Sequence, residues 1–341
     1  MQGRKRSREA VESEVPTLNF PSPEQYIRTN TKSRPKPSKS PGLEIQSSPT
    51  SINEAFPNTT TRPHNDTTNT ATPTHPIKMN DMYSQPAVLP DENRIIPTIH
   101  LVRHAQGFHN LSVENESFPD PDLTPLGEHQ CSDLRAAFPF HSKLVKLVAS
   151  PLRRTIHTCN LSFGGPGMLY PIILLDILQE VSNSPCDTGS SKEKLLEEFG
   201  DHDLDLDGVR DDWTNKGKGS VFEPTVEALT ARAKEARRKL KEIAEVMEGD
   251  IAVVTHGGFL HFLTDDWEGI PSGKATAWTN CMRRSYTFEE CPDDETDVRL
   301  VETQESREQR KHNAKPLTLT ERRELKAAVQ AKIAPYLHIN A

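Results

Sequence analysis

Apolar residues gather in four short runs in the middle of the chain, each bounded by polar or turn-forming residues. The runs cover 98–103, 145–149, 171–177 and 250–255. Their length is typical of buried β-strands, and segments with helical patterns lie between them. Because strands that alternate with helices usually form parallel sheets, the pattern predicts an α/β domain with three α/β/α layers and a mostly parallel central sheet.

Two of the intervening segments carry clear helix signals. In residues 224–248, apolar side chains recur every three or four positions, with Pro224 suited to the first turn and Gly249 to the stop. A second helix is predicted to open after Thr124 as its N-cap, with Pro125 in its first turn. The first of these helices is interpreted as a packing element without chemistry.

The two ends of the chain differ in composition from the middle. Residues 1–92 hold thirteen of the 27 prolines among many serines, threonines and asparagines. We expect this segment to be disordered, because isolated apolar residues cannot offset the entropy of ordering it. Residues 93–302 are expected to form the folded domain. Residues 303–341 are predicted to form a charged tail with a short helix near Thr320. The pattern leaves open whether that helix packs on the domain.

Composition and charge exclude several classes of protein. The net charge of −8 argues against a nucleic-acid partner, and no run approaches the roughly 18 apolar residues of a membrane span. Five cysteines without a C-x-x-C pair favour a reducing compartment. No apolar core follows the basic N-terminus, so a cytoplasmic protein is expected. The cluster Arg4–Arg8 is either a solvated charge run or a nuclear address.

Polar motifs follow the predicted strands directly, at the ends where open α/β sheets place their ligands. These motifs are Arg103-His104, Ser150–Thr155, Leu178–Val181 and Val253–Gly258. Arginines match the charge and geometry of a phosphoryl group with forked donors. A histidine can attack phosphorus and form a covalent intermediate, and a carboxylic acid can protonate the leaving oxygen. The motifs therefore predict a phosphate site that needs no metal and no cofactor.

Taken together, the motifs resemble the histidine phosphatase superfamily, also called phosphoglycerate mutase-like, and similar stretches occur in a fungal branch of it. The shared features are the strand followed by Arg-His, the Asn six residues after the His, L-T-x-x-G-x-x-Q at 123–130, S-x-L-x-R at 150–154 and T-H-G-G at 255–258. They occur in the family's order across residues 96–290. The resemblance implies the family's α/β fold and a phosphotransfer activity.

The resemblance also implies roles for single residues. His104 would be the nucleophile that becomes phosphohistidine, Glu180 the general acid, and His256 a residue that completes the pocket. The phosphate-binding positions would be Arg103, Asn110, Arg154 and Gly257. Asn110 could also orient its loop, and the N–H groups after His256 would point toward an anion.

Three stretches depart from the family's pattern. Ala105 stands where the family usually has glycine, which is tolerated if its φ stays negative. Gly107 replaces the usual serine three residues after the nucleophile, so one hydroxyl donor to phosphate is missing. After Glu180 the sequence departs from the mutase pattern, and its polar residues are expected on the leaving-group side. Those residues are Ser182, Cys186, Asp187 and Thr188.

The sequence thus predicts phosphomonoester hydrolysis through phosphohistidine, acting on a small phosphorylated metabolite or a phosphoprotein. Two alternatives stay open: a phosphoglycerate mutase with the same nucleophile, and a silent protein that binds phospho-ligands or serves as a scaffold. The remaining histidines of the domain are interpreted as surface or packing residues. They include His109, His129, His157 and His261. The sequence does not indicate what the terminal segments bind.

Overall fold

The computed structural model describes most of the chain after residue 96. The described ranges are 97–165, 169–200, 203–247, 249–271, 276–291, 294–310 and 317–337. The segment that the sequence predicts to be disordered, residues 1–92, lies outside them.

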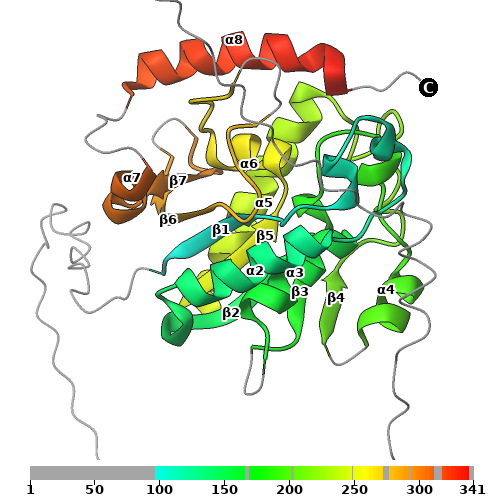
Figure 1. The fold of residues 1–341 in the computed structure, drawn as a ribbon. Coiled ribbons are helices and arrows are strands. Elements are labelled where there is room, and N and C mark those ends of the chain that lie inside the picture. The colour runs from blue at the N-terminus through cyan, green and yellow to red at the C-terminus, as the bar shows by residue number, and fades with distance from the viewer. Residues whose placement is uncertain are drawn as a thin grey trace, which may run out of the picture. The chain divides into compact units, whose positions relative to one another are not determined.

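A seven-stranded sheet lies at the centre of the part of the chain that the structure describes (Figure 1). The strands are β1 (Ile99–Arg103), β2 (Leu144–Ala149), β3 (Ile172–Leu175), β4 (Leu204–Gly208), β5 (Asp250–Thr255), β6 (Arg283–Glu290) and β7 (Val298–Glu302). Their order is β4-β3-β2-β5-β1-β6-β7. β1 to β5 pair in parallel, whereas β6 and β7 are antiparallel, so the prediction of a mostly parallel sheet is confirmed.

The observed strands correct the sequence prediction at β3 and at three strands that it lacks, β4, β6 and β7. The run 171–177 ends as a strand at Leu175, because Asp176–Leu178 turn into a short 3-10 helix, η4. The sequence reading also lacks β4, whose alternating leucine and aspartate residues form an edge strand. Leu204 is the buried member of that strand. An edge strand needs few buried side chains, so its apolar signal is weak.

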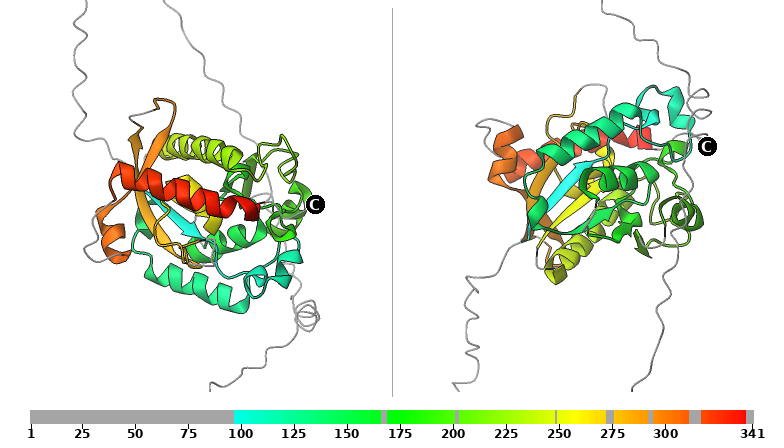
Figure 2. Two further views of the ribbon diagram at one scale, coloured as in Figure 1. Left: turned by 90° about the horizontal axis from the view of Figure 1, so that it is seen from above. Right: turned by 60° about the horizontal axis from the view of Figure 1, so that its bottom comes forward.

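Helices cover both faces of the sheet. They are α2 (Pro125–Ala137), α3 (Arg153–Phe163), α4 (Lys192–Phe199), α5 (Val226–Met247), α6 (Gly257–Thr264), α7 (Gln304–Arg310) and α8 (Leu319–Leu337). α2 and α3 lie on one face, and α5 and α6 lie on the other (Figures 1 and 2). This arrangement confirms the three-layer α/β/α prediction.

Alternating residues of the central strands supply a hydrophobic core on each face. In β5, Ile251 and Val253 belong to the core shared with α5 and α6, while Ala252 and Val254 belong to the core shared with α3. All four side chains are fully buried. The strand therefore reads as a continuous apolar run, as expected for a parallel strand that is covered on both sides.

Local capping explains where the helices begin. The Thr124 hydroxyl accepts a hydrogen bond from the Gly127 N–H, and Pro125 occupies the first turn, as predicted. The long helix α5 begins at Val226 rather than at Pro224. There the hydroxyl of Thr225 accepts from the Ala228 N–H, so a threonine cap sets this boundary instead of the proline.

The charged C-terminal segment contains two described helices, α7 and α8. The helix expected near Thr320 spans nineteen residues, Leu319–Leu337, so it is longer than the short one that the sequence suggested. Leu325, Val329 and Ile333 pack against the core on the α5 side, and Leu337 is buried there. The side chain of Lys326 also pairs with Asp265 at 3.0 Å. This segment thus covers part of the domain. None of the described helices is long and apolar enough to cross a membrane.

Candidate active site

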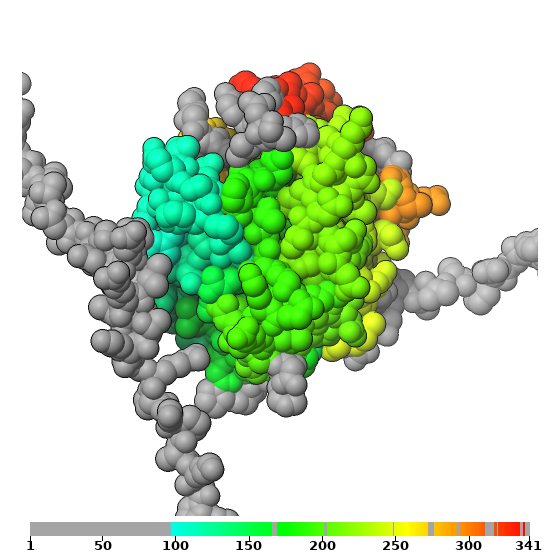
Figure 3. Space-filling model, turned by 90° about the vertical axis from the view of Figure 1, so that its right-hand side faces the viewer, coloured from blue at the N-terminus to red at the C-terminus, as the bar shows by residue number. Residues whose placement is uncertain are grey.

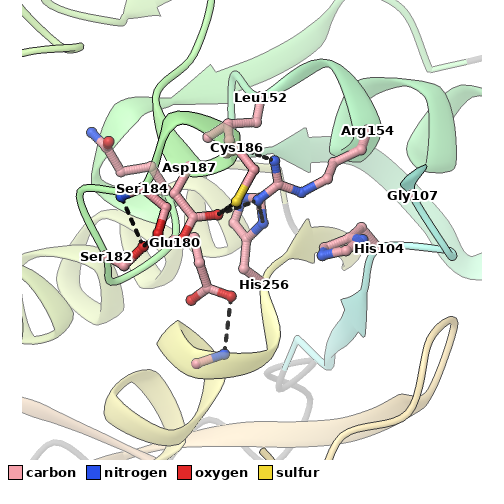
Figure 4. Close-up of polar contacts among 12 residues, drawn as sticks. His104, Gly107, Leu152, Arg154, Glu180, Ser182, Ser184, Cys186, Asp187 and His256 are labelled. Carbon is pink, nitrogen blue, oxygen red and sulfur yellow. Dashed lines mark hydrogen bonds and ion pairs between the residues drawn. The ribbon is translucent and has the colours of Figure 1, made fainter. Parts of the chain in front are cut away.

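The predicted site residues meet at the carboxyl ends of β1, β2, β3 and β5. Figure 4 shows His104, Arg154, Glu180 and His256 grouped around one region, although they come from four separate segments of the chain. Parallel pairing of β1 with β5, and of β5 with β2, brings these strand ends to the same edge. The topology therefore assembles the motifs as an open α/β sheet does at its ligand-binding edge.

His104 is held in a single orientation at the end of β1. Its ring Nδ1 lies 2.7 Å from the Ala105 carbonyl oxygen, and its backbone N–H donates to the Thr255 carbonyl oxygen at 2.9 Å. A carbonyl oxygen only accepts, so Nδ1 carries the proton and Nε2 keeps its lone pair. Burial, together with the charges of Arg154 and Arg103, holds the pKa of His104 well below its usual value. The ring is therefore neutral at neutral pH, with a lone pair on Nε2.

Ala105 is compatible with this arrangement. The described non-glycine residues with positive φ are Asp120, Asp265 and Cys281, so the backbone of Ala105 does not enter the left-handed region. Its N–H donates to the Thr158 hydroxyl at 3.0 Å, and its methyl group is fully buried. Alanine was expected to be tolerated here if its φ stays negative, and this is the case.

The guanidinium of Arg103 is held by a hydrogen bond and lies close to the backbone of Gly257. Its Nη1 donates to the Trp278 carbonyl oxygen at 2.5 Å. A Cβ atom on Gly257 would lie 3.0 Å from Arg103 Nε, so the glycine makes room for the guanidinium. Arg103 Nε itself is buried and has no partner among the described residues.

Arg154 is fully buried and already has three partners. Its Nη1 donates to the Cys186 carbonyl oxygen at 2.6 Å. Its Nη2 donates to Asp187 Oδ1 at 2.9 Å and lies 3.2 Å from His256 Nδ1. Arg154 Nε is buried without a partner in the described structure. A phosphoryl oxygen at this guanidinium would have to share it with the carboxylate of Asp187.

His256 orients Arg154 in this structure. Because a guanidinium can only donate, His256 Nδ1 is the acceptor of that contact. His256 Nε2 therefore carries the proton and donates to the Ser150 hydroxyl at 2.8 Å. Burial, followed by the charge of Arg154, keeps the pKa of His256 well below its usual value. Ser150 was not singled out by sequence reasoning, although it opens the S-x-L-x-R motif.

Glu180 sits at the N-terminus of α6. Its Oε1 accepts from the N–H groups of Val181 at 3.0 Å and Phe259 at 2.9 Å, and its Oε2 accepts from the Gly258 N–H at 3.2 Å. The N–H groups after His256 were expected to point toward an anion, and in this structure they bind the carboxylate of Glu180. Burial and then the charge of Asp187 raise the pKa of Glu180, despite the backbone donors that lower it. A raised pKa means that the acid form of this carboxyl group persists to higher pH than that of an ordinary glutamate.

The second glycine of the T-H-G-G motif makes space for Glu180. A Cβ atom at Gly258 would lie 2.6 Å from Glu180 Oε1. We expect Gly258→Ala to displace the carboxyl group and to lower kcat/KM for phosphomonoesters by about 100-fold, since small misplacements of a reacting group are costly. Steady-state assays check this, with Gly217→Ala at an exposed position as the matched control. Equal kinetics in both variants would contradict the packing argument.

Asn110 organises the loop after His104. Its Oδ1 accepts from the Gly107 N–H at 3.1 Å, and this closes the short turn η1 (Phe108–Asn110). Asn280 Nδ2 donates to the His104 carbonyl oxygen at 3.0 Å and lies 3.4 Å from Asn110 Oδ1. Of the two roles implied for Asn110, the contacts in this structure correspond to orienting the loop. Asn280 was missed, because no motif places it near the site.

His109, which the sequence suggested to be a surface or packing residue, lies beside His104. Its ring centroid is 5.3 Å from that of His104, about the same as the 5.2 Å between His104 and His256. His109 is half-buried, and its Nδ1 is fully covered. Its position five residues after His104 in the same loop was the only available signal, and it could not show where the ring points.

Arg153, the neighbour of Arg154, faces away from the site. It pairs with Asp122 at 2.7 Å and with Glu198 at 2.6 Å, and His157 lies 3.0 Å from Glu198. The three residues Asp122, His157 and Glu198 lie close enough to hold a metal ion. Because the Arg153 guanidinium already contacts both carboxylates, we interpret the group as an ion-pair cluster.

This cluster should make stability depend on pH. Although burial opposes it, hydrogen bonds to Asp122 and Glu198 raise the pKa of His157 to about 9. The contribution of His157 is therefore fully present below its unfolded pKa of about 6.5 and is lost as pH rises through about 9. We expect His157→Ala to cost about 1 kcal/mol more at pH 6 than at pH 10, a value limited by partial exposure.

Denaturant unfolding at the two pH values measures this difference. The control is His129→Ala, whose exposed side chain pairs only with Asp133 in the described structure. A destabilisation by His157→Ala that does not change with pH would show that the ring contributes packing against Phe199 rather than charge.

Comparison with known proteins identifies the family. The model of the histidine phosphatase superfamily (branch 1) matches residues 99–304. The chain belongs to the histidine phosphatase superfamily. This chain is similar to two proteins of Arabidopsis thaliana that are called phosphoglycerate mutase-like. One is 31% identical over 235 residues, which is 56% of this chain and 84% of the relative. Phosphoglycerate mutase-like protein 1 is 30% identical over 198 residues, 48% of this chain and 69% of the relative.

Solved structures with a similar fold include two phosphatases. The ecdysone phosphate phosphatase from Bombix mori, in complex with tungstate, has a TM-score of 0.41 and 16% identity, covering 56% of this chain and 88% of that one. A phosphoserine phosphatase from Entamoeba histolytica has a TM-score of 0.35 and 17% identity, covering 60% of this chain and 95% of that one.

Proposed function

We propose that this protein hydrolyses phosphomonoesters through a phosphohistidine on His104, without a metal. The observation that carries the proposal is the free Nε2 of a neutral, buried His104 beside the charges of Arg103 and Arg154. The two permanent charges suit the phosphoryl oxygens in the transition state. The proposed substrate is a small phosphorylated metabolite or a phosphoprotein.

The reaction follows from the protonation states of two residues. His104 Nε2 attacks phosphorus, so a P–N bond forms while the bond to the ester oxygen breaks. Glu180 gives its proton to the leaving oxygen. Water then attacks the phosphohistidine, Glu180 takes the proton from that water, and the electron pair of the P–N bond returns to Nε2. Inorganic phosphate is the second product.

The leaving-group side is expected to lie near Asp187 and Glu116. The 3-10 turns η2 (Glu114–Ser117) and η5 (Pro185–Asp187) contact each other, and these cyan and green segments lie side by side at the surface (Figure 3). Burial and the charge of Asp187 raise the pKa of Glu116. Because Asp187 is paired with Arg154, Glu116 is the carboxyl group that we expect to disfavour a substrate with its own carboxylate, such as 3-phosphoglycerate. This supports hydrolysis over the mutase alternative.

The test is phosphate release from generic phosphomonoesters by the full-length protein, with a chelator present. We expect turnover that the chelator does not reduce, together with no isomerisation of 3-phosphoglycerate. Isomerisation would favour the mutase. Phosphate binding without turnover on a broad panel of metabolites and phosphopeptides would favour the silent binding protein.

A further inference from the structure

The space beside Gly107 is filled by the ring of His109. A Cβ atom built on Gly107 would lie 2.8 Å from both Cε1 and Nδ1 of His109. The backbone at Gly107 has a φ of −98°, which any residue can adopt. Glycine is therefore required here by the neighbouring ring and not by the backbone conformation. The family's serine hydroxyl would occupy the space that this imidazole takes.

The His109 ring has a buried nitrogen without a partner. Its Nδ1 is fully covered and makes no hydrogen bond to any described residue. Arg103 Nε and Arg154 Nε share this property. A buried donor without a partner is costly, so these three nitrogens, which belong to residues at the site of His104, suit a ligand that brings acceptor oxygens.

The charges around His109 indicate what that ligand is. Burial, and then the charges of Arg154 and Arg103, lower the pKa of His109 to about 2. The ring therefore stays neutral and can offer one N–H donor beside two guanidinium groups. A group with several negative oxygens is the kind of ligand that matches such donors.

We propose that His109 is a phosphate-binding residue, whose Nδ1–H donates to a phosphoryl oxygen in place of the hydroxyl that Gly107 lacks. This inference rests on the proposed phosphate site and adds a member to it. The ring position explains both departures at once: the serine is absent because its Cβ would collide with the imidazole, and the imidazole supplies the donor.

The first measurement is the binding of orthovanadate and inorganic phosphate, which does not depend on turnover. Titration calorimetry compares the wild type with His109→Ala and His109→Asn, and His129→Ala serves as the control at an exposed histidine. We expect His109→Ala to weaken binding about 10- to 100-fold, as for a lost hydrogen bond to a charged group. His109→Asn keeps an amide N–H near the position of Nδ1 and should recover most of the affinity.

The second measurement is a double-mutant cycle between positions 107 and 109. Gly107→Ser alone should weaken vanadate binding, because its Cβ collides with the ring. In the His109→Ala background the same change should strengthen binding, since the hydroxyl then has space and replaces the donor. The carbonyl oxygen of Asp122 lies 3.1 Å from that Cβ, so only a small shift is needed. A reversal of sign is the expected coupling between contacting residues.

The outcomes separate this inference from the proposed function. If the wild type hydrolyses esters and His109→Ala binds vanadate as the wild type does, the inference is wrong and the function stands. If the wild type hydrolyses no phosphomonoester but binds phosphate, and His109→Ala loses that binding, the inference stands and the proposed function is wrong. Equal effects of Gly107→Ser in both backgrounds would also overturn the inference. Thermal melting confirms that each variant is folded.

Discussion

His104→Ala is expected to lower kcat/KM for phosphomonoester hydrolysis by roughly 10⁴-fold or more. The effect is large because His104 Nε2 is the atom that forms the bond to phosphorus in the proposed reaction. His256 has both ring nitrogens engaged, by Arg154 and by Ser150. Loss of a nucleophile leaves only the contribution of transition-state binding by the remaining residues.

A trapping experiment gives the positive side of this prediction. Wild type mixed with ³²P-labelled substrate and quenched in base should retain label on the protein, and acid should release it, as expected for a phosphoramidate. His104→Ala should retain none. Its affinity for inorganic phosphate should stay close to that of the wild type, because Arg103 and Arg154 remain. Activity within about tenfold of the wild type would rule out His104 as the nucleophile.

Glu180→Gln is expected to affect substrates according to their leaving groups. Glutamine keeps the size of the side chain and an oxygen that can accept from the Phe259 N–H, but it has no proton to give. For alkyl phosphates, whose leaving oxygen needs that proton, kcat/KM should fall about 10²- to 10⁴-fold. For p-nitrophenyl phosphate, whose leaving group departs as the anion, the fall should be smaller than about tenfold.

The pH profile gives an independent measure of the same role. Because burial raises the pKa of Glu180, its acid form persists to higher pH than that of an ordinary glutamate. Wild-type kcat/KM for alkyl phosphates should fall as pH rises through that pKa, and the fall should vanish in Glu180→Gln. Asp187→Asn is the matched control, because it changes the other carboxyl group beside Arg154. A pH limb that disappears in Asp187→Asn instead would move the acid role to Asp187.

The sequence predicted the fold well where elements are buried on both sides. The apolar runs of β1, β2 and β5 can be recognised because most residues in a covered parallel strand are apolar. Strands β4, β6 and β7 and the length of α8 were missed for the opposite reason, because polar residues lie between their apolar positions. Helix α8 is held on the domain by a few leucine, valine and isoleucine contacts with the core.

By itself, the sequence determined the residue types at each strand end, their order, and therefore the family. Such motifs are local: a strand, a turn and a reactive side chain lie within a few consecutive residues. Only the tertiary structure decided which of those side chains share one site and in what state. The neutral tautomer of His104, the pairing of Arg154 with Asp187, and the His109 ring beside Gly107 depend on contacts between segments distant in the chain or on how a loop closes. Burial at that junction sets their protonation, and no local pattern encodes it.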